Sequence, residues 1–355
     1  MYNLLLITGD LNFTNGVTTH LFNLIIELEK HKEINITLLC TGGDSIERFK
    51  ALKISIIQDD NFEHDKRNVK NFYIAVKSLI KIIRKNKIDI VHSHNHYAAN
   101  ISHYASRLTG VKTIQTNHGL IPEGGILKHF KAHKIITVNE QIEKYLVKNK
   151  IVKKEKITSI NQGFQYNGDI IKSKDEIKII CASRLIHEKG ADIFIRAAKI
   201  VTFKKKAGIK FLIAGEGEYE DELKKLSKEL DTKITFAGKI TDLPGLLSQT
   251  NIFVMSSRSM SEGFPMTIVE AALTKNFIIA SGLDPVKGIF RNGIDGFTFK
   301  TGDHQDLAQK IMIAIDEPEE TTRMTDSFFR RSKKLFDPVA KADKHTALYK
   351  KCLET

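Results

Sequence analysis

Two glutamates, Glu262 and Glu270, flank a turn that joins an apolar run to a helical pattern. The run Asn251–Met255 is long enough for a buried strand, and a helix starts within residues 267–273. Gly263-Phe264-Pro265 marks a tight turn between them. Glu262 therefore lies in the loop after the strand, and Glu270 lies eight residues further on, inside the expected helix.

The start of this helix is suited to binding an anion, and the two carboxylates are suited to binding hydroxyls. Free backbone N–H groups at the positive end of the helix are expected from Phe264, Pro265, Met266 and Thr267. Each carboxylate can accept charge-assisted hydrogen bonds from two hydroxyls. A nucleotide sugar supplies a phosphate and hydroxyls together. The alternative is a structural strand–turn–helix unit whose glutamates cap the helix or face solvent.

Arg184 and Lys189 flank a second strand-to-helix turn, within residues 181–190. An arginine with its planar fork and a lysine with its point charge can neutralise a diphosphate, although a solvated surface pair is the alternative. The chain contains no Asp-x-Asp pair to hold Mg²⁺. We therefore expect no metal, and a leaving diphosphate would be stabilised by side chains and helix ends.

Four histidines stand near expected strand ends. His92, His94 and His96 alternate, so they point the same way if the strand extends through them. They can hold a metal with an open position, face a substrate from a loop, or form an inert polar strand end. His118, in Asn117-His118-Gly119, suits hydrogen bonding or proton handling at the next strand end, unless the backbone simply satisfies it.

Gly16 lies in the first strand-to-helix turn, within residues 14–20. A glycine there permits close approach of the backbone to a ligand, and the following helix start offers N–H groups. A plain tight turn would have the same sequence.

Apolar runs alternate with helical patterns along the whole chain, which predicts parallel sheets with helices on both faces. We expect an α/β protein with two doubly wound, Rossmann-like domains facing across a cleft, and ligands at the carboxyl ends of the strands. The expected N-terminal domain is 1–163 plus a terminal helix over 338–355, the second domain is 175–337, and 164–174 is a linker. Strands are expected at 2–8, 34–40, 54–57, 88–93, 112–116, 134–138, 156–160, 176–183, 209–215, 234–236, 252–255, 277–280 and 297–299. In the first domain, helices are expected at 17–30, 69–85, 98–108 and 140–149.

Composition excludes several classes of protein. The 355 residues exceed a typical single core, and three widely spaced cysteines argue for a reducing cytosol and against a disulfide framework or a cysteine zinc site. The apolar start, residues 4–7, is only a strand's length, so neither a signal peptide nor a membrane span is expected. The net charge is +13, and residues 1–163 hold 24 Lys and Arg against 15 Asp and Glu. This bias favours an anionic partner, although a lysine-rich proteome would produce it too.

A basic segment from Lys66 to Lys87 has eight basic residues and no acidic one. Val69, Phe72, Val76, Leu79 and Ile83 recur at helical spacing and are expected to face the core. Another face then carries Lys70, Lys77, Lys81 and Arg84. This stripe predicts either attachment to an anionic membrane surface or a merely solvated face.

The order and spacing of these motifs resemble retaining glycosyltransferases of the GT-B fold, family 4, over most of the chain. Glu262-Gly263-Phe264-(x)5-Glu270 is similar to the Glu-x7-Glu signature of that family, and residues 183–190 are similar to its diphosphate loop. Residues 212–217 and 236–240 resemble its nucleotide-facing strand ends, residues 134–140 also fit, and 336–349 resembles the terminal helix that returns to the first domain.

The resemblance implies roles for individual residues. Glu270 would hold the ribose hydroxyls, and the Ile240 backbone would contact the base. Arg184 and Lys189 would bind the diphosphate, with Gly215 at a strand end beside them. Glu262 and the 264–267 backbone would bind the sugar to be transferred. His118 would touch that sugar at the reaction centre, His94 would lie on the acceptor side, and Gly16 would leave room for the phosphates.

Two segments depart from the family pattern. Thr274-Lys275-Asn276 replaces a small-residue Gly-Pro turn, and Asn161-Gln162-Gly163-Phe164 replaces Pro-Asn-Gly. These changes affect packing and the hinge more than the chemistry, and they leave the sugar donor open.

We therefore expect a metal-independent, retaining hexosyltransferase that uses a nucleotide sugar, and we expect this donor to be a UDP-sugar. Its expected acceptor is a saccharide or a lipid-linked hydroxyl in bacterial cell-surface glycan or glycolipid synthesis. We expect it in the cytoplasm, with peripheral attachment to the inner face of the membrane as a hypothesis. The rivals are a GT-B sugar-nucleotide epimerase and a hydrolase with a metal on His92, His94, His96 and His118. Nucleic-acid binding is not expected, because basic segments interleaved with aromatics are lacking.

Overall fold

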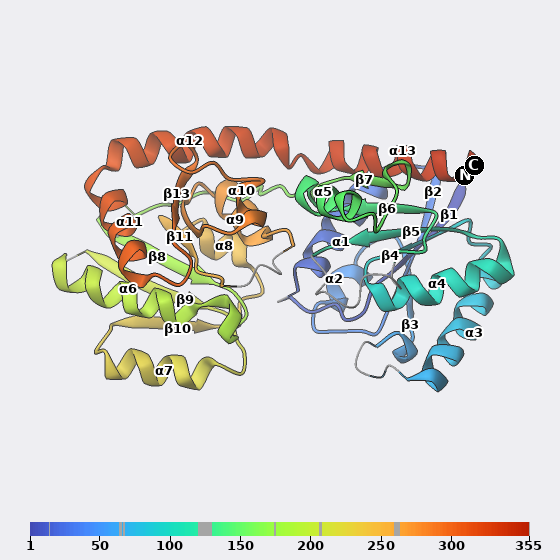
Figure 1. Cartoon of the computed structure of the whole chain (residues 1–355), viewed down its shortest axis with the longest axis horizontal. Helices are drawn as coiled ribbons and strands as arrows, with labels where there is room; N and C mark the ends of the chain where they lie inside the picture. The colour runs from blue at the N-terminus through green and yellow to red at the C-terminus, as the bar shows by residue number, and fades with distance from the viewer. Residues whose placement is uncertain are drawn as a thin grey trace. The chain divides into compact units, whose positions relative to one another are not determined.

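The chain divides into two compact units. The computed structural model describes residues 1–13, 15–63, 66, 68–119, 130–173, 175–205, 208–258 and 263–354. One unit comprises residues 1–163 and 338–355, and the other comprises residues 164–337 (Figure 1).

The first unit is built on a parallel sheet of seven strands in the order β3-β2-β1-β4-β5-β6-β7. The strands are β1 (Tyr2–Ile7), β2 (Ile34–Cys40), β3 (Ser55–Gln58), β4 (Ile90–Ser93), β5 (Lys112–Asn117), β6 (Lys134–Thr137) and β7 (Ile157–Ser159). The helices include α1 (Gly16–Leu28), α2 (Ile46–Lys50), α3 (Val69–Lys85), α4 (His96–Thr109), α5 (Glu140–Lys148) and α13 (Pro338–Glu354).

Successive residues of β1 serve opposite faces of this sheet, because side chains alternate along a strand. Leu4 and Leu6 pack in a core with α1 and α13, including Tyr349. Leu5 and Ile7 pack in a second core with α3 and α4. The continuous apolar run that predicted a buried strand is therefore explained by helices on both faces.

The second unit has a parallel sheet of six strands in the order β10-β9-β8-β11-β12-β13. The strands are β8 (Ile177–Ala182), β9 (Ile209–Ala214), β10 (Ile234–Gly238), β11 (Ile252–Met255), β12 (Phe277–Ser281) and β13 (Gly296–Phe299). The helices include α6 (Ala191–Lys204), α7 (Glu220–Glu229), α8 (Leu243–Leu247), α9 (Met266–Leu273), α10 (Asp284–Lys287), α11 (His304–Asp316) and α12 (Pro318–Leu335). Each unit is thus doubly wound, and the fold class expected from the sequence is confirmed.

The segment expected as a linker differs from its expected form, whereas the terminal helix keeps the expected boundary and leaves residues 336–337 outside it. The expected linker is grouped with the second unit, where the Ile171 N–H donates to the carbonyl of Ser248 at 3.1 Å and Lys172 Nζ donates to the carbonyl of Leu247 at 2.8 Å. The terminal helix begins at Pro338, because Phe336 still closes α12 by donating its N–H to the carbonyl of Ser332.

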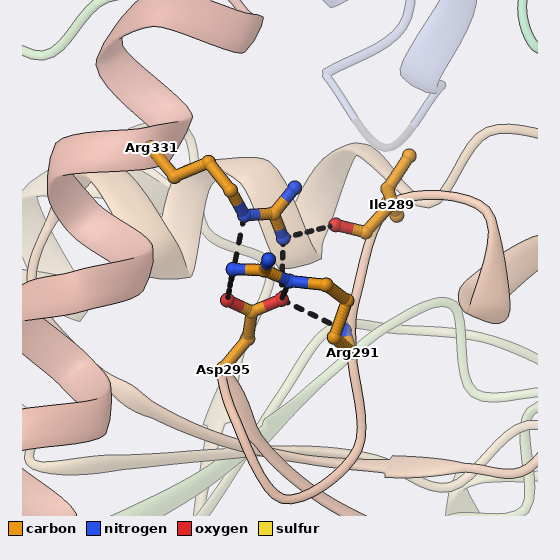
Figure 2. A network of polar contacts seen from close by, with 4 residues as sticks. All are labelled: Ile289, Arg291, Asp295 and Arg331. Carbon is orange, nitrogen blue, oxygen red and sulfur yellow. Dashed lines mark hydrogen bonds and ion pairs between the residues drawn. The ribbon is translucent and has the colours of Figure 1, made fainter.

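A buried carboxylate ties the turn before β13 to helix α12 (Figure 2). Asp295 accepts hydrogen bonds from Arg291 Nε at 3.0 Å and Arg331 Nη2 at 2.5 Å. Arg331 Nη2 also donates to the carbonyl of Ile289 at 2.7 Å. Burial raises the pKa of Asp295, but the bonds from the two arginines outweigh it, so the net shift is downward. The carboxylate therefore stays charged within a satisfied network.

Candidate active site

Backbone hydrogen bonds connect the residues at the carboxyl ends of β8, β9 and β10. The Leu185 N–H donates to the carbonyl of Glu216 at 2.9 Å, and the Gly215 N–H donates to that of Gly238 at 2.8 Å. Gly215 has a φ of +132°, and a Cβ there would lie 1.9 Å from the carbonyl oxygen of Ser183. Only glycine fits this position, so the turn after β9 supports the turn after β8.

The two cations predicted to bind a diphosphate lie at this edge of the sheet. Arg184 is exposed, and Lys189 is partly buried at the end of a 3-10 helix, His187–Lys189, that precedes α6. Ile240, the predicted base contact, is partly buried two residues beyond β10. The structure thus brings Arg184, Lys189, Gly215 and Ile240 to the carboxyl edge of one sheet, where ligands of such folds bind.

Hydrogen bonds that the sequence pattern did not predict hold the loop after β11 against the loop after β8. Ser256 Oγ donates to the carbonyl of Lys189 at 3.1 Å, and the Arg258 N–H donates to that of Glu188 at 2.8 Å. The Arg258 guanidinium donates to both carboxylate oxygens of Asp192, at 2.7 and 2.6 Å. Burial raises the pKa of Asp192, but these bonds outweigh it and the net shift is downward. Asp192 is the acidic residue in the first turn of α6, and it is the feature of the sequence from which this ion pair could have been suspected.

The predicted anion site at α9 needs a correction. Pro265 has no N–H, and the N–H of Met266 donates to the carbonyl of Phe264 at 2.9 Å. The expected set of four free N–H groups is therefore wrong, and only those of Phe264 and Thr267 remain candidates. Phe264, Pro265 and Met266 are buried.

The two glutamates of the signature are in different situations. Glu270 lies inside α9, and only 6% of its surface is exposed. A ligand can therefore contact it only by packing directly against it. Glu262 lies outside the described residues.

Five histidines of the first unit form one cluster, in which His118 is partly buried and the other four are buried. His92 lies in β4, His94 follows it, His118 follows β5, His20 lies in α1, and His345 lies in α13. The rings of His92 and His94 are 4.3 Å apart, and those of His20 and His118 are 5.2 Å apart. His20 and His345 carry no motif that would have marked them in the sequence.

Hydrogen bonds orient the two histidines at the strand ends. His118 Nε2 lies 3.1 Å from His94 Nδ1, and His118 Nδ1 lies 3.3 Å from Nε2 of Gln162. His92 has both nitrogens engaged, Nδ1 with the Tyr349 hydroxyl at 2.8 Å and Nε2 with Thr116 Oγ1 at 2.7 Å. Gln162 occupies the segment that departs from the family pattern, and it sits against the predicted catalytic histidine.

Burial keeps these imidazoles neutral. It is the main cause that lowers the pKa of His118 to about 3 and that of His345 to about 4. Burial and neighbouring imidazoles also lower the pKa of His20, His92 and His94. At neutral pH, His118 is therefore neutral: it can take part in hydrogen bonds, but it does not carry the extra proton that a general acid would donate.

The alternating trio of histidines does not converge. Strand β4 ends at Ser93, and His96 begins α4, where its Nδ1 lies 2.8 Å from Gln115 Nε2. The ligand set His92, His94, His96 and His118 is therefore not assembled, because His92 is fully engaged and His96 faces another partner.

Gly16 is exposed at the start of α1. Asn15 caps this helix: its side chain accepts a hydrogen bond from the Val17 N–H at 3.0 Å, and its carbonyl accepts from the N–H groups of Thr18 at 3.0 Å and Thr19 at 3.3 Å. These three N–H groups are therefore already engaged within the chain.

Two family models match the chain in succession. Residues 14–165 match Glycosyltransferase Family 4, and residues 166–328 match Glycosyl transferases group 1.

Named relatives and solved structures agree with these matches. A UDP-Gal:alpha-D-GlcNAc-diphosphoundecaprenol alpha-1,3-galactosyltransferase of Escherichia coli is 25% identical, over 82% of each chain. The capsular polysaccharide biosynthesis glycosyltransferase CapM of Staphylococcus aureus is 24% identical, over 82% of this chain and 83% of that protein. A glycosyltransferase structure from Rickettsia africae superposes with a TM-score of 0.83 at 20% identity, covering 100% of this chain and 99% of the other. Anabaena HepE in complex with UDP-glucose superposes with a TM-score of 0.82 at 17% identity, covering 99% and 100%.

The two family matches together span residues 14–328, and the doubly wound units are those of the superposed enzymes. The chain is therefore a glycosyltransferase of the GT-B fold and belongs to the family 4 type.

Proposed function

We propose that the enzyme transfers a sugar, with retention and without a metal, from a UDP-sugar to a hydroxyl of a lipid-linked or saccharide acceptor in cell-surface glycan synthesis. The observation that carries this is the edge of the second sheet. There, Arg184 and Lys189 flank a turn braced by Gly215 and by the Asp192–Arg258 pair. A relative that uses UDP-galactose and a superposed structure that contains UDP-glucose support the choice of donor.

In the proposed reaction, the bond between the anomeric carbon and the diphosphate oxygen breaks, and the acceptor oxygen bonds to that carbon on the same face. Arg184, Lys189 and a helix N-terminus stabilise the charge that develops on the diphosphate. The departing phosphate accepts the proton of the acceptor hydroxyl. Retention results, because attack and departure share one face of the sugar.

The proposed roles of the remaining residues rest on their chemistry. Glu270 accepts hydrogen bonds from the ribose hydroxyls, and Glu262 binds the transferred sugar. His118, kept neutral by burial, hydrogen-bonds a sugar hydroxyl without adding a positive charge that would compete with the cations for the diphosphate.

A membrane-bound acceptor is supported by an exposed surface on α3 and α4. Lys70, Lys77, Lys81 and Arg84 are exposed, whereas Val76, Leu79 and Ile83 are buried. Val69 was expected in the core but is 89% exposed, because it starts α3 beyond the last packed turn.

Apolar and aromatic side chains accompany these cations. Tyr73 is 60% exposed, with Lys77 Nζ 4.5 Å from its ring centre, and Leu108 of α4 is 65% exposed. Phe72 and Tyr104 connect α3 to α4 at 5.5 Å between ring centres. Basic residues beside aromatic and aliphatic ones suit an anionic membrane interface. Among the described residues, no helix combines the length and apolarity required to cross a bilayer. We therefore propose peripheral binding at the inner face of the membrane, where a lipid-linked acceptor is reached.

A thermal-shift screen of nucleotides and nucleotide sugars tests the proposed donor, because a ligand that binds the folded state raises the melting temperature. UDP and one UDP-sugar should stabilise the protein without added metal. Stabilisation by another nucleotide alone, such as GDP, would replace the proposed donor class.

A further inference from the structure

Three histidines from three separate elements bring ring nitrogens together in the first unit. His20 of α1, His94 after β4 and His118 after β5 each offer one nitrogen, and these three atoms lie within 4.8 Å of one another. His94 Nδ1 and His118 Nε2 are 3.1 Å apart. The ligating nitrogens of two imidazoles on a tetrahedral zinc ion lie about 3.3 Å apart, given Zn–N bonds of about 2.0–2.1 Å. This pair is therefore already spaced like two ligands of one ion.

The imidazole of His20, the third histidine, makes no hydrogen bond within the part of the chain that the structure describes. His20 is 3% exposed, and neither of its ring nitrogens has a hydrogen-bond partner there. Nε2 of His94 is also buried without a partner among the described residues. Buried polar atoms are normally satisfied, so an unpaired imidazole aimed into a cluster of others points to a missing ligand.

The other two histidines of the cluster lie outside this set of three. Both nitrogens of His92 are hydrogen-bonded, and His345 Nδ1 lies 2.8 Å from the carbonyl oxygen of Lys341. Nε2 of His345 is buried without a partner among the described residues, but it is not one of the three nitrogens that lie within 4.8 Å of one another. The trio is therefore singled out by its distances, and within it His20 has both ring nitrogens unpaired among the described residues.

Gln162 is placed to orient a metal-bound His118. If His118 binds an ion through Nε2, its Nδ1 carries the proton and needs an acceptor. Gln162 Oε1 is buried without a partner among the described residues, and the amide of the same side chain lies 3.3 Å from Nδ1. A flip of that amide presents the oxygen to Nδ1.

We propose that His20, His94 and His118 form a binding site for one divalent transition-metal ion, with zinc as the best match, and that the bound ion inhibits the glycosyltransferase. Three neutral imidazoles with one open position suit zinc, whereas Mg²⁺ and Ca²⁺ require oxygen ligands. Binding takes the nitrogens that now join His94 to His118, so His118 can no longer contact the sugar. The inhibitory part rests on the proposed function; metal binding itself does not.

Zinc titration of the metal-free full-length protein tests the site without any substrate. Calorimetry should show one Zn²⁺ per chain, and Co²⁺ should give the intense visible absorption of a tetrahedral site. His20→Asn and His94→Asn should each weaken binding at least tenfold, whereas His345→Asn, a substitution in the same cluster, should leave it within threefold. His20→Gln repeats the test if the Asn variant unfolds, and circular dichroism checks each variant.

Two results would overturn the site: no saturable binding by wild type, or an equal loss of affinity in the His345 variant. Inhibition is then measured with the donor found by thermal shift, each variant relative to its own metal-free rate. Zinc should inhibit wild type, and His20→Asn should raise the half-inhibitory concentration at least tenfold. One-to-one binding without inhibition would discard the inhibitory role and question the proposed contact of His118. A failed donor screen would leave the binding result standing.

Discussion

The guanidinium of Arg258 donates two hydrogen bonds to the carboxylate of Asp192, at 2.7 and 2.6 Å. Arg258 follows β11 and Asp192 lies in the first turn of α6, so this pair closes the base of the loop that carries Arg184 and Lys189. Rigid support of this kind keeps charged groups positioned without reorganisation during reaction.

Asp192→Asn should therefore weaken binding of the nucleoside diphosphate about tenfold, which corresponds to about 1.4 kcal/mol. The substitution replaces one acceptor oxygen with a donor facing Arg258, so the loop loses its fixed position. Binding is measured by calorimetry. Asp316→Asn is a matched control, because Asp316 pairs with Lys205 at the surface of the same unit. Equal affinities of the Asp192 variant and wild type would separate this pair from the nucleotide site.

Glu270→Ala should reduce affinity for the nucleotide sugar strongly and stability only slightly. Losing one partner of a buried charged hydrogen bond in a ligand site costs about 2–5 kcal/mol. Titration with the nucleotide sugar gives the affinity, and a melting curve gives the stability. Glu222→Ala on exposed α7 is the control. An unchanged affinity in the Glu270 variant would remove this residue from the site.

Arg184→Ala and Lys189→Ala should each lower turnover by about 10²–10³, because negative charge grows on the diphosphate as the bond breaks. Arg196→Ala, an exposed cation on α6, should retain the wild-type rate. EDTA should leave activity intact, since no carboxylate pair holds a metal in the proposed reaction. Initial rates within threefold of wild type in both loop variants would place the diphosphate elsewhere.

Replacing Lys70, Lys77, Lys81 and Arg84 with Gln should release the protein from anionic vesicles. Each basic residue near such a surface contributes about 1 kcal/mol. Co-flotation with phosphatidylserine vesicles at low and high salt measures the effect, which salt should weaken. The control replaces four exposed lysines of the second unit, Lys224, Lys225, Lys228 and Lys233. If wild-type protein does not float with the vesicles at low salt, a soluble acceptor becomes the better proposal.

Asp295→Asn should destabilise the protein by about 1.5–3 kcal/mol, the range for hydrogen bonds to charged groups. The native pKa of Asp295 is lowered, so its stabilising contribution is present above the unfolded pKa, about 3.9, and is lost as the pH falls through the native value. Urea unfolding should therefore show a constant difference between wild type and variant from pH 5 to 8 and a smaller one at pH 3. The same difference at pH 3 and pH 7 would rule out charge as its source.

The sequence by itself determined where the strands lie and which strand ends carry chemistry. Residues 4–7 and 252–255 are apolar because both faces of each sheet are covered, and this local pattern is legible without contacts. Arg184 lies two residues after β8 and His118 directly after β5, so their place at a sheet edge could be predicted from the expected strands.

Only the tertiary structure decided which side chains meet. His345 is far from His20 in sequence, yet the packing of α13 beside α1 places their rings 6.2 Å apart. Asp192 and Arg258 meet because β8 and β11 are neighbours in the sheet, and Gln162 reaches His118 across 44 residues. Residues near the end of an element were also predicted wrongly. Because β4 ends at Ser93, His96 does not continue the alternation of the strand, and Val69 lies beyond the packed part of α3. Periodicity reports burial along one element, whereas these contacts depend on strand order and helix docking, which the pattern within a single element does not specify.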